Sequence, residues 1–157
     1  MQPRTIKYAL SEDEIFELIE NGKVGHLATV GEDGWPYVIP INYVTLNGKL
    51  YLHCRKAGGM KLDNLRDDDR VCFEVSTVSG YKTGETPCKN TTLFRSAIGR
   101  GRARILGDGD PLIEATLLRF TEVYAPHLSE PVIPKDKMEL AAVIELTIDK
   151  WTGKYSS

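Results

Sequence analysis

The residues best suited to chemistry lie between Trp35 and Lys61. Arg55, Lys56 and Lys61 are three cations that bracket the pair Gly58-Gly59, where a short helix is predicted to begin. The free backbone N–H groups at a helix start, helped by nearby cations, bind anions such as phosphate. The spacing is not that of a Walker A loop. The pattern therefore indicates either an anion site or a solvated basic turn.

Two neighbouring residues add to this pattern. Pro40 stands inside an otherwise strong strand, where its missing N–H removes one ladder hydrogen bond and indicates a sheet edge or a bulge. His53 ends the next strand, beside the basic turn, and could bind phosphate, donate to a ligand or satisfy a backbone carbonyl. An interrupted strand beside a phosphate-binding turn suggests a bound cofactor.

A second basic segment runs from Lys82 to Arg104, with six basic residues and one acidic residue, Glu85. The small residues on one face of this strand, Ala97, Gly99, Gly101 and Ala103, would allow another backbone or a flat ligand to approach closely. Its arginines either bind an anion or a dimer partner, or pair with acidic turns. Counting by twos from Ser96 places Ser96, Ile98, Arg100, Arg102 and Arg104 on one strand face and Ala97, Gly99, Gly101, Ala103 and Ile105 on the other.

The sequence shows no catalytic group of its own. Cys54, Cys72 and Cys88 have no CxxC spacing, which predicts reduced thiols in a cytoplasmic protein and no metal site. No nucleophile elbow is present, so an enzyme would need a cofactor to supply the chemistry. A net charge of −2 argues against nucleic-acid binding. The sequence shows no leader segment and no apolar run of about 18 residues, so we expect the protein neither to be exported nor to span a membrane.

The elements that position these residues are mostly strands. A capping box at Ser11 begins a helix that Asn21-Gly22 ends, a second helix covers Gly59–Leu65, and a third follows the N-cap Asp110 and ends at Pro126. Asn47-Gly48 predicts a tight hairpin, and residues 79–92 are predicted to be an exposed loop. The predicted strands cover Val24–Val30, Trp35–Thr45, Leu50–Cys54, Arg70–Thr77, Leu93–Leu106 and Ala142–Ile148. Six strands joined by hairpins, without a βαβ rhythm, favour a small antiparallel barrel in a single domain, residues 1–157.

The order of four segments resembles a known superfamily. GHLATVGEDGWPYVIPINYV is followed by NGKLYLHCRKAGGMKLDNL, RVCFEV and FRSAIGRGRARIL, and the chain closes with IDKWTGK. This order is similar to that of the FMN-binding split-barrel superfamily, in its nitroimidazole-resistance branch, which is related to pyridoxamine 5′-phosphate oxidase. The resemblance covers roughly residues 5–153. It implies a mainly β protein with flanking helices, built as a six-stranded antiparallel split β-barrel of Greek-key type.

The resemblance also implies a homodimer that holds two FMN molecules in grooves between its subunits. Pro40, Ile41 and Asn42 would contact the isoalloxazine ring through backbone groups. Arg95 and Ser96 would border the same groove, from the same chain or from its partner. The residues that would surround the FMN phosphate are His53, Arg55, Lys56 and Lys61.

Two functions follow from this resemblance. The first is an FMN-dependent oxidoreductase that takes electrons from a nicotinamide or other donor and reduces a small acceptor. The second is a flavin or haem carrier or sensor without turnover, and FAD, a deazaflavin and haem are alternative cofactors. Pyridoxamine phosphate oxidases carry a C-terminal segment with arginine and histidine for the vitamin phosphate. This chain ends WTGKYSS, so oxidation of vitamin B6 is not expected.

Overall fold

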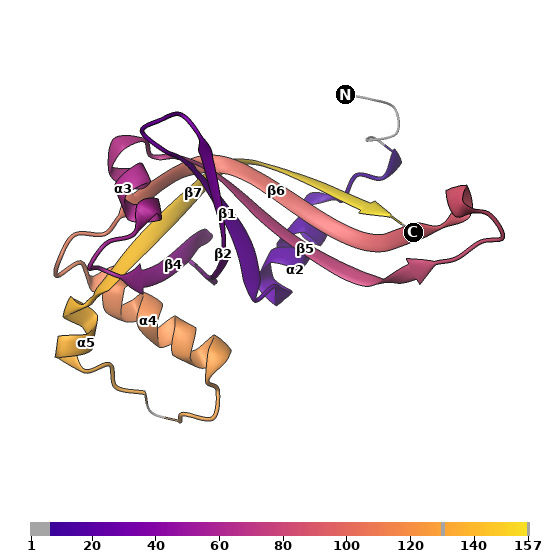
Figure 1. The fold of residues 1–157 in the computed structure, drawn as a ribbon. Helices are drawn as coiled ribbons and strands as arrows, with labels where there is room; N and C mark the ends of the chain where they lie inside the picture. Colours follow the sequence, from indigo (N-terminus) through magenta and orange to yellow (C-terminus); the bar gives the residue numbers. More distant parts are fainter. Residues whose placement is uncertain (1–6, 130, 157) are drawn as a thin grey trace.

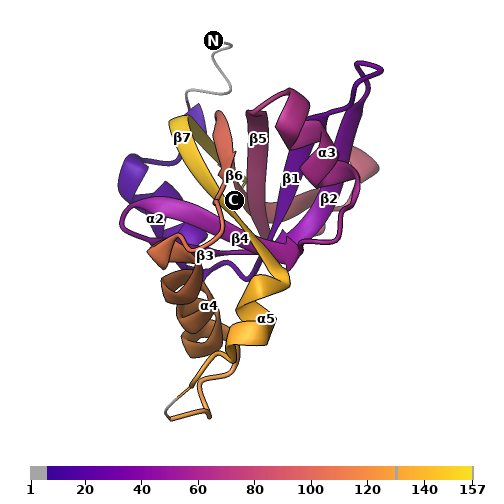
Figure 2. The ribbon, with the colours of Figure 1, turned by 90° about the vertical axis from the view of Figure 1, so that its left-hand side faces the viewer.

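The strands form one antiparallel sheet that curls on itself, with helices packed around it (Figures 1 and 2). The computed structural model describes residues 7–129 and 131–156. The strands are β1 (Val24–Val30), β2 (Pro36–Asn42), β3 (Val44–Leu46), β4 (Lys49–Arg55), β5 (Arg70–Lys82), β6 (Thr91–Ile105) and β7 (Ala141–Ser156). The helices are α2 (Glu12–Asn21), α3 (Met60–Asp67), α4 (Pro111–Tyr124) and α5 (Lys135–Glu139), with a 3-10 turn, η1, at Pro87–Lys89.

The two edges of the sheet are joined by one residue. The strand order is β2-β1-β5-β6-β7-β4-β3, so the edge strands β2 and β3 follow each other in the chain with Tyr43 between them. The expected antiparallel, barrel-like fold is confirmed. The strand count of six is wrong, because the predicted strand Trp35–Thr45 divides at Tyr43 and the sheet has seven strands.

The division at Tyr43 has a local cause. The hydroxyl of Tyr124 on α4 lies 3.2 Å from the amide nitrogen of Tyr43 and 2.8 Å from its carbonyl oxygen. These contacts replace the ladder hydrogen bonds that a continuous strand would make. The phenol of Tyr43 is buried and donates to the carbonyl of Ile19 at 2.6 Å. The bend is therefore anchored from both α2 and α4.

Most local signals in the sequence are confirmed. Ser11 caps α2 with a full capping box, and Asp110 caps α4 with Pro111 at its first position. Asn47 and Gly48, with φ of 51° and 75°, form the hairpin between β3 and β4. Pro40 pairs only with β1, because β2 is an edge strand of the sheet, as its missing N–H predicted.

The long strands extend beyond their predicted ends. Residues 79–92 were predicted to be a loop, but β5 continues to Lys82 and β6 begins at Thr91, with Lys82 and Thr91 paired. β7 likewise runs eight residues past Ile148, to Ser156. The outer parts of β5, β6 and β7, with the turn between β5 and β6, together form an arm that extends to the right in Figure 1. Its residues are largely exposed, so the alternation of apolar and polar residues that marks a half-buried strand is missing.

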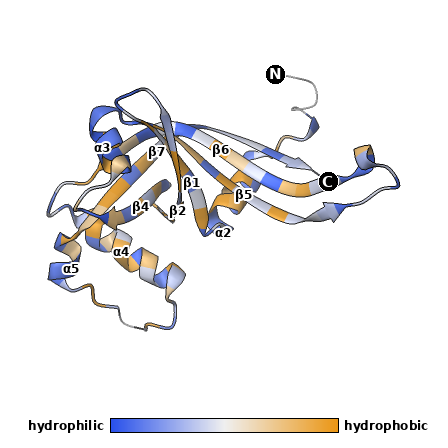
Figure 3. Ribbon diagram, in the orientation of Figure 1, coloured by the Kyte–Doolittle hydropathy of each residue, from blue (hydrophilic) through white to orange (hydrophobic). Residues whose placement is uncertain are grey.

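The core lies inside the curled sheet. Leu27, Leu52, Phe73, Ile144 and Leu146 are fully buried there, and apolar residues gather on the strands around this interior (Figure 3). A smaller cluster lies between α4 and the outer side of β3, β4 and β7. None of the helices in the described ranges is long and apolar enough to cross a membrane.

The small-residue face of β6 serves this core rather than a ligand. A Cβ on Gly99 would lie 2.7 Å from Ile148 and 2.8 Å from Trp151, and a Cβ on Gly101 would lie 1.9 Å from the carbonyl oxygen of Thr147. The second backbone that these residues admit is therefore β7 of the same chain. The interpretation as a surface for a flat ligand is wrong.

The arginines of the opposite face pair with acidic residues of the same chain. Arg102 forms an ion pair with Asp69 at 2.5 Å, and Arg104 contacts Glu145 at 3.2 Å and Asp110 at 3.7 Å. For Arg102 and Arg104, the alternative of pairing with acidic residues of the same chain is therefore confirmed. Arg100 is exposed and makes no ion pair with another described residue.

Glu145 is a buried carboxylate whose charge is fully partnered. Its exposed fraction is 5%, and it accepts from Tyr51 at 2.8 Å, Arg104 at 3.2 Å and Lys49 at 3.0 Å. Burial alone would raise the pKa of Glu145, but these contacts outweigh burial and lower the pKa to about 2. Burial and the hydrogen bond with Glu145 raise the pKa of Tyr51 to about 12.

We expect this carboxylate to stabilise the fold at neutral pH and to lose that effect in acid. A group whose folded pKa is lowered contributes stability above its unfolded pKa and loses it as pH falls toward the folded value. Glu145→Gln should therefore reduce the free energy of unfolding by about 2–3 kcal/mol at pH 7. The difference from the parent should shrink between pH 5 and pH 2.5, measured by urea unfolding. Glu114→Gln, at an exposed position of α4, is the control, and a difference independent of pH would contradict the assignment.

Candidate functional site

Strand β4 places the central residues of the site. Leu52 is buried and Cys54 packs against the core, so the alternation along the strand turns His53 and Arg55 to its outer side. Across the ladder, His53 pairs with Val143 and Arg55 with Ala141 on β7. Both side chains therefore lie on the face that α4 and α5 flank.

A cavity of about 560 Å³ opens beside His53. The ring of His53 meets Phe120 edge-on, with 4.3 Å between centroids, and Phe120 stacks on Tyr124 at 5.5 Å and 19°. Desolvation lowers the pKa of His53, which favours its neutral imidazole. The cavity is lined by Asn42, His53, Leu117, Phe120, Thr121, Tyr124, Ala125, Ile133, Lys137 and Ala141.

The basic turn after β4 offers donors for an anion. Arg55 is exposed and has no ion pair with another described residue. The start of α3, at Gly59, has no side-chain cap, so its first N–H groups are left for another acceptor. Burial raises the pKa of the Cys54 thiol, and the neighbouring Lys61 ammonium lowers it in part. Arg55, Lys61 and the start of α3 all lie in the segment that follows β4, which is the segment predicted to bind phosphate.

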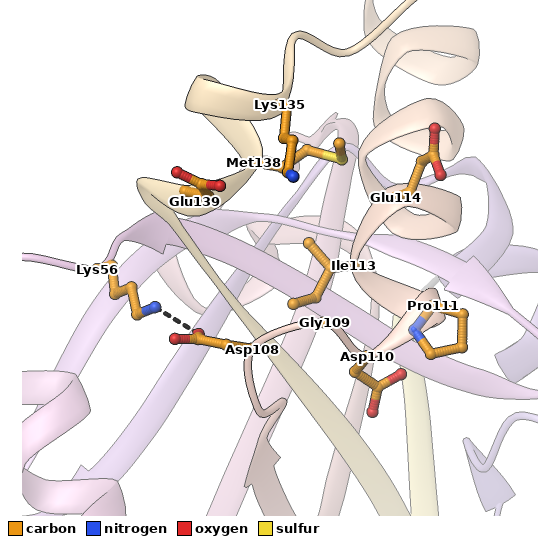
Figure 4. Close-up of a pocket in the computed structure, with 10 residues that line it drawn as sticks. All are labelled: Lys56, Asp108, Gly109, Asp110, Pro111, Ile113, Glu114, Lys135, Met138 and Glu139. Atoms are coloured by element: carbon orange, nitrogen blue, oxygen red, sulfur yellow. Dashed lines mark hydrogen bonds and ion pairs between the residues drawn. The ribbon is translucent and has the colours of Figure 1, made fainter.

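Lys56 lies apart from these donors. Its ammonium forms an ion pair with Asp108, across a second cavity of about 540 Å³ (Figure 4). Four carboxylates line this cavity, those of Asp108, Asp110, Glu114 and Glu139. An acidic surrounding of this kind repels phosphate. In this structure the Lys56 ammonium therefore faces Asp108, whereas Arg55 has no ion pair with another described residue.

The residues predicted to contact the ring lie on the edge strand β2. Pro40 and Asn42 are exposed and Ile41 is half-buried against the core. The amide of Asn42 donates to the carbonyl of Lys23 at 3.2 Å, and Asn42 lines the cavity together with His53. Two parts of the predicted site, β2 and β4, are thus brought together by the curl of the sheet.

Arg95 and Ser96 are not brought to this cavity. Arg95 lies on β6 in the arm and forms ion pairs with Glu14 and Glu17 of α2, both at 3.3 Å. It pairs with Tyr155 of β7, whereas His53 pairs with Val143, twelve residues back along β7. That is a contour length of roughly 40 Å. Within one chain the predicted site is divided between the two ends of β7.

The comparisons with known proteins agree on one family. A family model described as pyridoxamine 5′-phosphate oxidase matches residues 11–155, nearly the whole chain. The chain belongs to the pyridoxamine 5′-phosphate oxidase family. This family lies in the FMN-binding split-barrel superfamily that the segment order indicated, and the resemblance is confirmed. No curated protein matches the sequence.

Solved structures share the fold of this family member. A candidate 5-nitroimidazole antibiotic resistance protein from Bacteroides thetaiotaomicron is 23% identical, with 94% of this chain and 86% of that chain covered and a TM-score of 0.77. An FAD- and haem-binding protein from Mycobacterium smegmatis is 20% identical, with 94% and 72% covered and a TM-score of 0.78. An FAD-binding protein from Mesorhizobium loti is 25% identical, with 95% and 97% covered and a TM-score of 0.65.

Some residues of the cavity were not predicted from the sequence. Leu117, Phe120 and Tyr124 of α4 line the cavity, and an apolar stripe with this spacing is ordinarily the core face of a helix. Lys137 lies on α5, a helix that the sequence analysis did not predict. A Phe-x-x-x-Tyr spacing next to a proline-rich connection was the available signal, but ordinary core helices show the same spacing.

Proposed function

We propose that this member of the pyridoxamine 5′-phosphate oxidase family is an FMN-dependent oxidoreductase that acts as a homodimer. The proposal is supported by the family match, by the exposed Arg55 that follows His53 by two residues, and by the uncapped start of α3. When bound, FMN would take two electrons from a nicotinamide or other donor and pass them to a small acceptor.

The residues of the chain would hold and orient the cofactor. Backbone groups of Pro40, Ile41 and Asn42 on the sheet edge would contact the isoalloxazine ring. Arg55 and Lys61 would neutralise the phosphate, while Lys56 would remain paired with Asp108. His53 would donate or accept one hydrogen bond between the ring and the phosphate.

The division of the predicted site supports the proposed dimer. Arg95 and Ser96 could border the same flavin as His53 only if they came from a second copy, because β7 separates them within one chain. The arm that carries them extends away from α4 and α5, as Figure 1 shows. We therefore propose that each groove combines the β2–β4 side of one copy with the arm of the other.

We expect purified protein to be yellow, with flavin absorption bands that bleach when NADH or NADPH is added and return with an acceptor. Denaturation should release FMN, identified by its mass. Light scattering should give twice the 17.5 kDa mass of the chain. A colourless protein that takes up no added FMN would overturn the cofactor, and a mass of one chain would overturn the dimer.

The second candidate is a flavin or haem carrier or sensor. It is supported by the fold shared with the FAD- and haem-binding protein from Mycobacterium smegmatis. Stable flavin binding, without reoxidation by any of a broad panel of acceptors, would favour this candidate over the oxidoreductase.

A further inference from the structure

The hydroxyl of Tyr124 on α4 holds backbone groups beside the proposed ring contacts. It lies 2.6 Å from the carbonyl oxygen of Lys23 and 2.8 Å from that of Tyr43, and it accepts from the Tyr43 amide at 3.2 Å. The hydroxyl has one proton, so it donates to one of the two carbonyls at a time. The side chain of Asn42 donates to the same Lys23 carbonyl at 3.2 Å. Asn42, a proposed contact of the flavin ring, therefore shares a hydrogen-bond acceptor with Tyr124.

The ladder hydrogen bonds do not hold this junction. Asn42 is the last residue of the β1–β2 ladder, and Val44 is the first residue of the β3–β4 ladder. In the sheet, β2 and β4 are separated by β1, β5, β6 and β7. Within the described ranges no ladder pair therefore connects Asn42 to the strand that carries His53.

Helix α4 bridges this gap with two aromatic rings. Phe120 and Tyr124 lie four residues apart, on one face of the helix. Phe120 meets the His53 ring edge-on at 4.3 Å between centroids, and it stacks on Tyr124 at 5.5 Å. One turn of α4 thus contacts β4 through one ring and the end of β2 through the hydroxyl of the other.

We infer that Tyr124 is a positioning residue for the flavin ring, because it fixes the end of β2, and Asn42 with it, relative to His53 on β4. The inference rests on the proposed function, since the place of Asn42 matters to a flavin only if one binds along β2. Tyr124→Phe keeps the ring and its stacking but leaves the amide of the buried Tyr43 without its acceptor. An unpaired buried N–H is costly, so the end of β2 should shift.

The test measures the binding of riboflavin and FMN to Tyr124→Phe protein by flavin fluorescence quenching. The ring contact is disturbed and the phosphate contact is not, so both flavins should bind more weakly by the same factor, about tenfold. The absorption maximum of the bound flavin should also shift, which a loss of stability alone would not cause.

Tyr43→Phe is the matched control, because it removes a hydroxyl from the same bend on the side of α2. That hydroxyl donates to the carbonyl of Ile19 at 2.6 Å. The variant should unfold at a lower temperature, yet bind both flavins within about twofold of the parent. Unchanged riboflavin affinity in Tyr124→Phe, or an equal loss in Tyr43→Phe, would overturn the inference.

Hydrogen exchange of the flavin-free proteins separates this inference from the proposed function. The amide of Tyr43 should exchange faster in Tyr124→Phe than in the parent. A parent protein that takes up no flavin would refute the proposed function and, with it, the role of Tyr124 toward the ring. A parent that binds flavin, with a Tyr124→Phe variant that exchanges faster but binds riboflavin equally well, would refute the inference alone.

Discussion

Replacing Arg55 and Lys61 together by alanine should weaken FMN binding by about 100-fold or more. Each removes one charge-assisted contact to the phosphate, worth about 1.5–3 kcal/mol, and every 1.4 kcal/mol is tenfold in affinity. Riboflavin lacks the phosphate and should change by less than about threefold. Flavin fluorescence quenching with the two ligands measures both affinities on the same protein.

Lys56→Ala provides the comparison within the basic turn. The Lys56 ammonium is already paired with Asp108, so its removal should weaken FMN by less than about tenfold. Equal losses for FMN and riboflavin in the double variant would place the phosphate elsewhere. A Lys56→Ala effect as large as that of the double variant would show that Lys56 leaves Asp108 when the flavin binds.

Gly101→Ala should be the most damaging single substitution in the sheet. Its Cβ would lie 1.9 Å from the carbonyl oxygen of Thr147 and 2.8 Å from the Cα of Ile148, both backbone atoms of β7. The pairing of β6 with β7 shifts register between Arg100 and Gly101, and the close approach is part of that irregularity. We expect a loss of at least about 3 kcal/mol in unfolding free energy, or roughly 10 °C in Tm.

Gly107→Ala, just after the end of β6, is the control for Gly101→Ala. Nothing lies within 4 Å of a Cβ at this position, and its φ is outside the left-handed region, so the change should be nearly neutral. Thermal unfolding followed by circular dichroism compares the two variants. A Gly101→Ala protein as stable as the parent would mean that β6 and β7 can move apart at the register shift without a loss of unfolding free energy.

The fold was largely predictable because its signals are local. Capping residues, the Asn-Gly hairpin and apolar alternation act over a few residues, and each of them located an element correctly. The division at Tyr43 was not predictable, since its cause is the hydroxyl of Tyr124, 81 residues away. The arm was not predicted for another reason, because exposed strands show no regular alternation of apolar and polar residues.

The site was predictable only in part. The basic turn and the neighbouring histidine are close in sequence, so their grouping follows from the chain itself. The orientation of Lys56 toward Asp108 depends on how the α4 end of the molecule folds back onto β4, which no spacing encodes. Lys137 lies on a five-residue helix that is too short to show a periodic pattern. The positions of Lys56 and Lys137 in the site therefore depend on tertiary structure.

The placement of the proposed flavin contacts at opposite ends of β7 would make cofactor binding depend on protein concentration. If one flavin needs side chains from two copies, only the assembled pair binds it tightly, and the flavin in turn stabilises the pair by mass action. Dilution below the dissociation constant of the pair would then release the cofactor with the subunits. Abundance in the cell would act, by thermodynamic linkage alone, as a control on the holoprotein.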